Sequence, residues 1–318
     1  MCMQRYFLGI DGGQSSTSGL IGDETGHVLG LGRSGACNHV NAEEAREKFL
    51  RIIGECVERA RQAASLDSLV EFTAVCGGFS GGGADKDALI GELFPSAKRR
   101  VTHDALVALS GAHAGQPGII TIAGTGSISF GRRASGQIMR AGGWGYVFGD
   151  EGGGFDLTRQ ALRAALRMEE GWGPPTSLRE SLLKATGAKD ANEALHRFYS
   201  PDFPRSRVAS LSGLVDAAAS AGDRIAEGLL QEAAQRLAGI TSAVRGKLFQ
   251  TNECAPVAYI GGVFKSDRVR EQFTTLVERD GQAKVSPPKF GPAAGALLEA
   301  YRLAGLLVEL TGLPESEK

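Results

Sequence analysis

The same short pattern occurs twice in this chain: an apolar run, a glycine-rich polar turn, and a second apolar run. The first copy covers residues 7–22 (FLGIDGGQSSTSGLIG), and the second covers residues 119–131 (IITIAGTGSISFG). Such a pattern is typical of two β-strands joined by a turn, since glycine and small polar residues adopt the backbone angles that turns require. The repeat therefore predicts two halves of similar plan.

The expected elements continue in the same order after each copy, so that each half reads βββαβαβα. In the first half we expect strands over residues 6–31, a helix over 41–60, a strand at 70–76, a helix at 86–93, a short strand ending at 102 and a helix from 105. In the second half we expect strands over 118–131 and 136–143, longer helical regions, a strand at 256–262, a helix from 266, a strand at 283–287 and a last helix at 292–310. The fold class is thus predicted to be α/β.

The length fits this duplication, because 318 residues exceed what one hydrophobic core usually supports. We expect one lobe over residues 1–116 and a second over 117–291, with the terminal helix (292–312) packed on the first. Small ligands commonly bind between domains, so a cleft between the lobes is the expected binding place.

Charge and cysteine usage narrow the class of protein. The chain carries 35 Lys and Arg against 36 Asp and Glu, which leaves no basic surface for nucleic acid or an anionic membrane. Its five cysteines are odd in number, widely spaced and without a C-x-x-C pair, as expected of reduced thiols in the cytoplasm. The first residues contain no long apolar run, so we expect neither a signal peptide nor an anchor.

The first glycine-rich turn has the composition of an anion site. Asp11 ends the strand, Gly12 and Gly13 form the turn, and Ser15, Ser16 and Thr17 follow. Backbone N–H groups in such a turn converge on an anion, and a carboxylate beside them suits Mg²⁺. The alternative is an ordinary hairpin turn in which Asp11 caps its own backbone.

The second turn, Gly124, Thr125 and Gly126, stands at the matching place of the second half, and IGGVFKS follows at residues 260–266. Together the three segments resemble the phosphate-1, phosphate-2 and adenosine motifs of the actin, sugar kinase and Hsp70 superfamily. The resemblance implies a duplicated ribonuclease H-like (actin-like ATPase) fold that binds ATP and Mg²⁺, with Asp11 at the metal. It implies these nucleotide contacts: Gly12, Gly13, Ser15, Ser16, Thr17, Gly124, Thr125, Gly126, Gly261, Gly262 and Ser266.

A longer segment, AGGWGYVFGDEGGGFDLTRQAL at residues 141–162, is more specific. It resembles N-acetylglucosamine kinases of the eukaryotic type and their bacterial relatives, a family of BadF/BadG/BcrA/BcrD-type ATPases. THDA at residues 102–105 and ACNHV at residues 36–40 fall where that family keeps its catalytic aspartate and a sugar-binding asparagine. By this resemblance Asp104 is the base that accepts the proton of the sugar hydroxyl, expected to be the 6-hydroxyl.

The same resemblance implies a set of sugar-binding residues: Asn38, Ser127, Trp144, Gly145, Tyr146 and Asp150. Three of the candidate residues also have a simpler structural alternative. Asp104 and Asp150 are also suited to capping a helix, and Trp144 is also suited to a core. Because all of these motifs occur together in one chain, we favour the interpretation that these residues bind substrate or catalyse the reaction.

Two departures from the animal enzymes affect the choice of sugar. Ile128 replaces an asparagine, and Ala141 replaces a cysteine. One lost polar contact can change discrimination strongly, so the sequence predicts an amino sugar without selecting among N-acetylglucosamine, glucosamine, N-acetylmuramic acid and N-acetylmannosamine.

Two other functions compete with a kinase. An ATPase that activates an iron–sulfur reductase would need cysteines near the glycine-rich turn, and IAGTGS has none nearby. A sugar-sensing regulator would carry an added DNA-binding helix-turn-helix, yet the first strand begins at about Tyr6. The family resemblance also implies a homodimer that acts on a small-molecule sugar.

Overall fold

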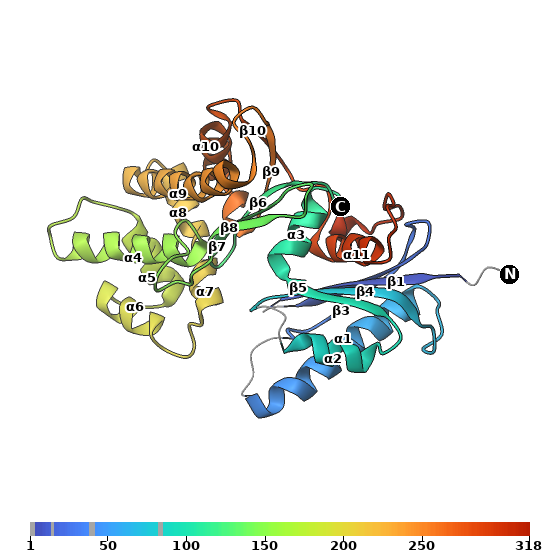
Figure 1. The fold of residues 1–318 in the computed structure, drawn as a ribbon. Coiled ribbons are helices and arrows are strands. Elements are labelled where there is room, and N and C mark those ends of the chain that lie inside the picture. Colours follow the sequence, from blue (N-terminus) through green and yellow to red (C-terminus); the bar gives the residue numbers. More distant parts are fainter. Residues whose placement is uncertain (1–3, 14–15, 38–41, 82–84) are drawn as a thin grey trace. The chain divides into compact units, whose positions relative to one another are not determined.

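The computed structural model describes residues 4–13, 16–37, 42–81 and 85–318 (Figure 1). The chain forms two compact units, one comprising the chain up to Pro117 together with Pro288–Lys318, and the other comprising Gly118–Pro287. No helix in the described part of the chain is long and apolar enough to cross a membrane.

The first unit contains a five-stranded sheet in the order β3-β2-β1-β4-β5. Strands β1 (Tyr6–Gly12), β2 (Thr17–Asp23) and β3 (Val28–Ser34) are antiparallel, whereas β4 (Phe72–Phe79) and β5 (Lys98–His103) run parallel to β1. The helices of this unit are α1 (Ala42–Ala63), α2 (Lys86–Leu93), α3 (Asp104–Ala112) and α11 (Pro292–Leu303), with a 3₁₀ turn, η2 (Glu315–Glu317), near the end of the chain.

Alternation of side chains along β1 separates two cores in this unit. Leu8 and Ile10 join a buried cluster with Ile53 of α1. Phe7 points to the other face, where its ring lies 4.5 Å from that of Tyr301 in α11. Helices therefore cover both faces of the sheet, as its parallel strands require.

The second unit repeats this plan, with strand order β10-β9-β6-β7-β8. Strands β6 (Gly118–Ala123), β7 (Ser127–Arg132) and β8 (Ile138–Gly142) are antiparallel, and β9 (Ala255–Ile260) and β10 (Ala283–Ser286) extend the sheet in parallel from β6. The long helix α9 (Arg224–Leu248) packs against β6, β7 and β8. The other helices of this unit are α4 (Gly154–Glu169), α5 (Leu178–Thr186), α6 (Ala191–Phe198), α7 (Arg205–Ser210), α8 (Gly213–Ser220), the 3₁₀ turn η1 (Gly262–Lys265) and α10 (Asp267–Glu278). The matching sheets confirm the predicted duplicated, actin-like fold.

The structure corrects the expected end of the last helix. It was predicted to reach residue 310 or 312, but α11 ends at Leu303. Gly305 adopts a left-handed backbone (φ 79°), its N–H donates to the carbonyl of Arg302, and the N–H of Leu306 donates to the carbonyl of Tyr301. This pair of bonds is a Schellman motif, which terminates a helix at a glycine whatever apolar residues follow.

The structure also extends the strand expected at residues 70–76, because β4 continues to Phe79 and so includes Gly77 and Gly78. A Cβ on Gly78 would lie 2.3 Å from a methyl carbon of Val107 in α3. Gly78 is therefore required by close packing between β4 and α3, whereas a Cβ on Gly77 would lie 2.6 Å from the ring of Phe79.

Candidate active site

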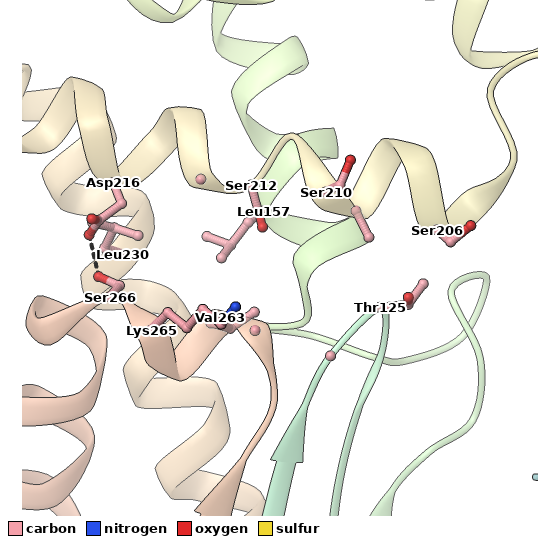
Figure 2. A pocket seen from close by; sticks show the side chains of 14 residues that line it. Thr125, Leu157, Ser206, Ser210, Ser212, Asp216, Leu230, Val263, Lys265 and Ser266 are labelled. Atoms are coloured by element: carbon pink, nitrogen blue, oxygen red, sulfur yellow. Dashed lines mark hydrogen bonds between the residues drawn. The ribbon is translucent and has the colours of Figure 1, made fainter. Parts of the chain in front are cut away.

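A cavity of about 490 Å³ lies within the second unit (Figure 2). Figure 2 shows Asp216 and Ser266 together on one side of it, with Leu230 beside them, and Thr125 on the other side, with the apolar side chains of Leu157 and Val263 in between. The lining is otherwise made of small or polar residues: Gly124, Ser206, Ala209, Ser210, Ser212, Gly213, Gly262 and Lys265. An apolar middle with polar ends suits a ligand that has a flat apolar part and a charged part.

The turn between β6 and β7 forms one wall of this cavity. The N–H of Gly124 donates to the carbonyl of Gly126 (3.0 Å), which closes the turn. The first N–H groups of α4 then tie the helix to the turn, from Gly154 to Gly124 (2.8 Å) and from Phe155 to Thr125 (3.0 Å). The positive end of α4 is therefore beside the glycine-rich turn, an arrangement that favours an anion such as phosphate.

The segment after β9 forms the opposite wall. Gly261 has φ 118°, and a Cβ there would lie 2.2 Å from the carbonyl oxygen of Ala123, so only glycine fits. Ser266 caps α10 and also donates a short hydrogen bond to the carboxylate of Asp216 in α8. Lys265 lies at the cavity with its side chain exposed, and no carboxylate of the described residues pairs with it.

In the first unit, the carboxyl ends of the parallel strands place Asp11 and Asp104 at one edge of the sheet. Asp11 pairs with Gly78 in β4, and Asp104 follows β5 as the first residue of α3. Ser80, next after β4, donates to Asp104 Oδ2 (2.8 Å), and the N–H of Ala105 donates to Oδ1 (2.8 Å). The carboxylate of Asp104 is thus fixed from both sides.

The helix cap resolves one alternative. His103, not Asp104, is the N-cap residue of α3, and the side chain of His103 makes no capping hydrogen bond. The sequence alternative that Asp104 serves as the N-cap is therefore wrong by one position, because the strand continues through His103.

Burial, together with the negative charges of Asp104 and Glu317, raises the pKa of Asp11 to about 7. The carboxylate makes no hydrogen bond or ion pair with another described residue. A cation bound here would offset the repulsion of Asp11 by Asp104 and Glu317. A cluster of carboxylates that is stabilised by a cation is the environment expected of a magnesium site. No group of three or more potential metal-ligating residues is found within the described ranges. Mg²⁺ nevertheless fits, since it commonly takes one or two carboxylates and completes its shell with water and phosphate oxygens.

Thr17 was expected to contact the nucleotide, but the structure gives it another role. It is fully buried, and its hydroxyl donates to the carbonyl of Gly35 (2.8 Å). The N–H of Gly13 donates to the carbonyl of Ser16 (2.9 Å) and closes the turn, while a Cβ on Gly12 would lie 2.4 Å from the ring of Phe79. Thr17 and Gly12 thus shape the turn, and the predicted contacts of Thr17 to a nucleotide are not favoured. Ser15 and Asn38 lie outside the described residues.

Asp150 is held rigidly in the second unit. It is 7% exposed and adopts a left-handed backbone (φ 62°), which is uncommon for a residue with a side chain. Its carboxylate fills the space where a Cβ on Gly126 would stand, 2.3 Å from Oδ2. Gly153 caps α4, so the alternative that Asp150 serves as this cap is wrong. Ser127 supports the loop by donating to the carbonyl of Glu151 (2.7 Å).

The aromatic residues of the loop before Asp150 are exposed. Trp144 is 67% exposed and Tyr146 is 41% exposed, so Trp144 is not a core residue. Gly145 between them has φ 81°. Arg140 stacks on Trp144 at 4.8 Å and Arg205 stacks on Tyr146 at 4.5 Å, measured from the guanidinium carbon to the ring centroid.

Comparison with known proteins identifies the chain. The sequence model of the BadF/BadG/BcrA/BcrD ATPase family matches residues 8–300. This chain belongs to that family.

Two relatives in the BadF/BadG/BcrA/BcrD family share most of its length. One, from Clostridium acetobutylicum and named N-acetylmuramic acid/N-acetylglucosamine kinase, is 32% identical over 93% of this chain and 98% of its own. Another, from Dictyostelium discoideum and named N-acetyl-D-glucosamine kinase, is 30% identical over the same shares. The solved structure of a candidate N-acetylglucosamine kinase from Chromobacterium violaceum matches with TM-score 0.75 and 27% identity, over 92% of this chain and 98% of that one.

Sequence reasoning on this BadF/BadG/BcrA/BcrD family member missed several residues of the site. Ser80 beside Asp104, Arg205 beside Asp150 and Asp216 in the cavity carry no motif of their own. The only available signal was the cluster of serines at 206, 210 and 212, which the helices α7 and α8 bring to one cavity wall.

Proposed function

We propose that this chain is an ATP-dependent kinase that transfers the γ-phosphoryl group to a hydroxyl of an amino sugar, expected to be the 6-hydroxyl of N-acetylglucosamine or glucosamine. The observation that carries this proposal is the cavity framed by the Gly124–Gly126 turn and the Gly261–Gly262 segment, in a chain whose relatives bear the names of amino-sugar kinases. The nucleotide would lie with its base near Asp216 and its phosphates near Thr125.

Asp104 is the proposed base. Its carboxylate, oriented by Ser80 and the N–H of Ala105, would accept the hydroxyl proton as the sugar oxygen bonds to the γ-phosphorus and the bond to the ADP oxygen breaks. Mg²⁺, held by Asp11, would supply charge neutralisation for the phosphates. Asn38, Ser127, Trp144, Gly145, Tyr146 and Asp150 are proposed to bind the sugar.

An activator of an iron–sulfur reductase is not favoured. Cys37, Cys56 and Cys76 are buried, and burial raises the pKa of Cys56 and of Cys76 to about 12. Such thiols are poor cluster ligands, because the thiolate is the form that binds metal.

The deciding experiment is a coupled assay of ADP release against a panel of amino sugars and their unmodified parent sugars. We expect release with at least one amino sugar and little with the parents. ATP hydrolysis that no sugar accelerates would overturn the proposal. We further propose that the chain forms a homodimer, which sedimentation of the purified protein can test, and that it acts in the cytoplasm, which cell fractionation can test.

A further inference from the structure

Arg205 occupies an unusual position beside the loop that is proposed to bind the sugar. It is the first residue of α7, and its guanidinium lies 4.5 Å from the ring centroid of Tyr146 and 6.0 Å from that of Phe155. Its Nη2 is 3.5 Å from Oδ2 of Asp150. Two aromatic faces and one carboxylate therefore hold the cation in place.

Most of the hydrogen-bonding capacity of this guanidinium is unused. Arginine carries five N–H donors, and the single contact to Asp150 is the one hydrogen bond that Arg205 makes with the described residues. The side chain is 43% exposed, so the remaining donors are accessible. By contrast, Arg159 in the same region donates to both Asp156 (2.6 Å) and the carbonyl of Tyr146 (3.2 Å).

Orientation of Asp150 does not account for Arg205. The contact of 3.5 Å is long for a charge-assisted hydrogen bond, which normally measures about 2.7–2.9 Å. The backbone angle of Asp150 and the close fit of its carboxylate against Gly126 already fix this residue. A stacked guanidinium with free donors is instead suited to a planar carboxylate, which it can bind with two parallel hydrogen bonds.

We propose that Arg205 recognises a carboxylate carried by the sugar, and that the substrates of this chain therefore include amino sugars with an acidic substituent, such as the lactyl ether of N-acetylmuramic acid. This inference rests on the proposed kinase function. A carboxylate fits better than a phosphate ester at the 6-position, because the 6-hydroxyl must remain free to accept the phosphoryl group.

The test compares two sugars that differ only in the lactyl ether, N-acetylmuramic acid and N-acetylglucosamine, by ADP release. Arg205→Gln should lower kcat/KM for N-acetylmuramic acid by about 10- to 100-fold, mainly through KM, since hydrogen bonds to charged groups contribute on this scale. For N-acetylglucosamine the same variant should lower kcat/KM at least about tenfold less than for N-acetylmuramic acid, because Arg205 would act on that sugar only through its 3.5 Å contact with Asp150. The matched control is Arg207→Gln, two residues along α7, where the guanidinium stacks on Phe203 away from Asp150 and should affect neither sugar.

A second measurement needs no variant and so does not depend on how Arg205→Gln folds. The methyl ester of N-acetylmuramic acid removes the negative charge, and wild-type protein should show a KM for it at least about tenfold higher than for the acid. An equal loss for both sugars in Arg205→Gln, or equal KM values for the acid and its ester, would overturn the assignment. Absence of ADP release with both sugars and with the rest of the panel would overturn the proposed function itself, and the assignment with it.

Discussion

At the scale of single residues, the carboxylate of Asp104 has the environment of a positioned base. Its two oxygens each accept one hydrogen bond, from Ser80 Oγ and from the N–H of Ala105, which leaves lone pairs for a substrate hydroxyl. Asp104→Asn should lower turnover by about 10²- to 10⁴-fold, the usual contribution of a general base. ADP release measures this loss, and Asp87→Asn serves as the control, because Asp87 lies on α2 of the same unit with its side chain about half exposed. Turnover within a few fold of wild type would remove Asp104 from the mechanism.

Gly126 gives a second prediction at this scale. Gly126→Ala would drive a methyl group into the Asp150 carboxylate, 2.3 Å from Oδ2, so this carboxylate must move. A displaced binding group of about 1 Å can reduce efficiency by up to about 10²-fold, so kcat/KM for the sugar should fall by at least about tenfold. Gly246→Ala in α9, where a Cβ meets no atom within 4 Å, is the matched control. Unchanged sugar kinetics would show that Asp150 does not contact the sugar.

These residues also show which parts of the site could be predicted from the sequence. Asp104 and Asp150 could be singled out because THDA (residues 102–105) and the segment at residues 141–162 resemble the N-acetylglucosamine kinase family. Arg205 and Ser80 were not, since their roles depend on contacts with residues 55 and 24 positions away. Such contacts arise when helices and strands pack against one another, and the local sequence pattern around each residue does not predict them.

At the scale of elements, one carboxylate joins the starts of two helices. Asp223 is the N-cap of α9, where its Oδ1 accepts from the N–H groups of Ile225 (2.9 Å) and Ala226 (3.1 Å). Its Oδ2 accepts from Ser177 N–H (2.7 Å) and from the hydroxyls of Thr176 and Ser177 at the start of α5. Burial opposes ionisation, but these hydrogen bonds outweigh it and lower the pKa of Asp223 to about 2.

Asp223→Ala should therefore destabilise the protein, by at least about 1–2 kcal/mol, the scale of one lost N-cap. Because the folded pKa lies below the unfolded value of 3.8, this stabilisation is complete above about pH 4 and is lost as the pH falls towards 2. Urea unfolding at pH 7 and at pH 3 should show the difference between variant and wild type shrinking at the lower pH. A difference that is constant or grows on acidification would contradict the assigned role of the ionised carboxylate.

The end of α11 shows where element prediction from sequence fails. Apolar residues continue through Leu310 with acceptable helical spacing, but the left-handed backbone at Gly305 ends the helix seven residues earlier. Glycine inside an apolar pattern is compatible with both outcomes. Only the hydrogen bonds of Gly305 and Leu306 to Arg302 and Tyr301 decide between them.

At the scale of the whole molecule, the duplication was predictable because each half repeats a strand, turn and strand pattern, and both sheets follow the same order of strands. The two units nevertheless carry different chemistry. The first holds Asp11 and Asp104, whereas the cavity proposed for the nucleotide is lined by residues of the second unit. Nucleotide binding and proton transfer should consequently be separable by substitution.

Gly262 allows this separation to be tested. It lines the cavity, and a Cβ at this position meets no atom within 4 Å, so Gly262→Val should add bulk to the cavity without disturbing packing. A ligand at 100 times its Kd stabilises a protein by about 2.7 kcal/mol, so ADP should raise the thermal midpoint of wild type and of Asp104→Asn by a similar amount. Gly262→Val should keep the midpoint of the free protein and lose most of this rise, because the added side chain competes with the nucleotide for the same volume. If ADP instead stabilises Gly262→Val as strongly as wild type, the nucleotide binds elsewhere, and the roles proposed for Thr125 and Ser266 fail with it.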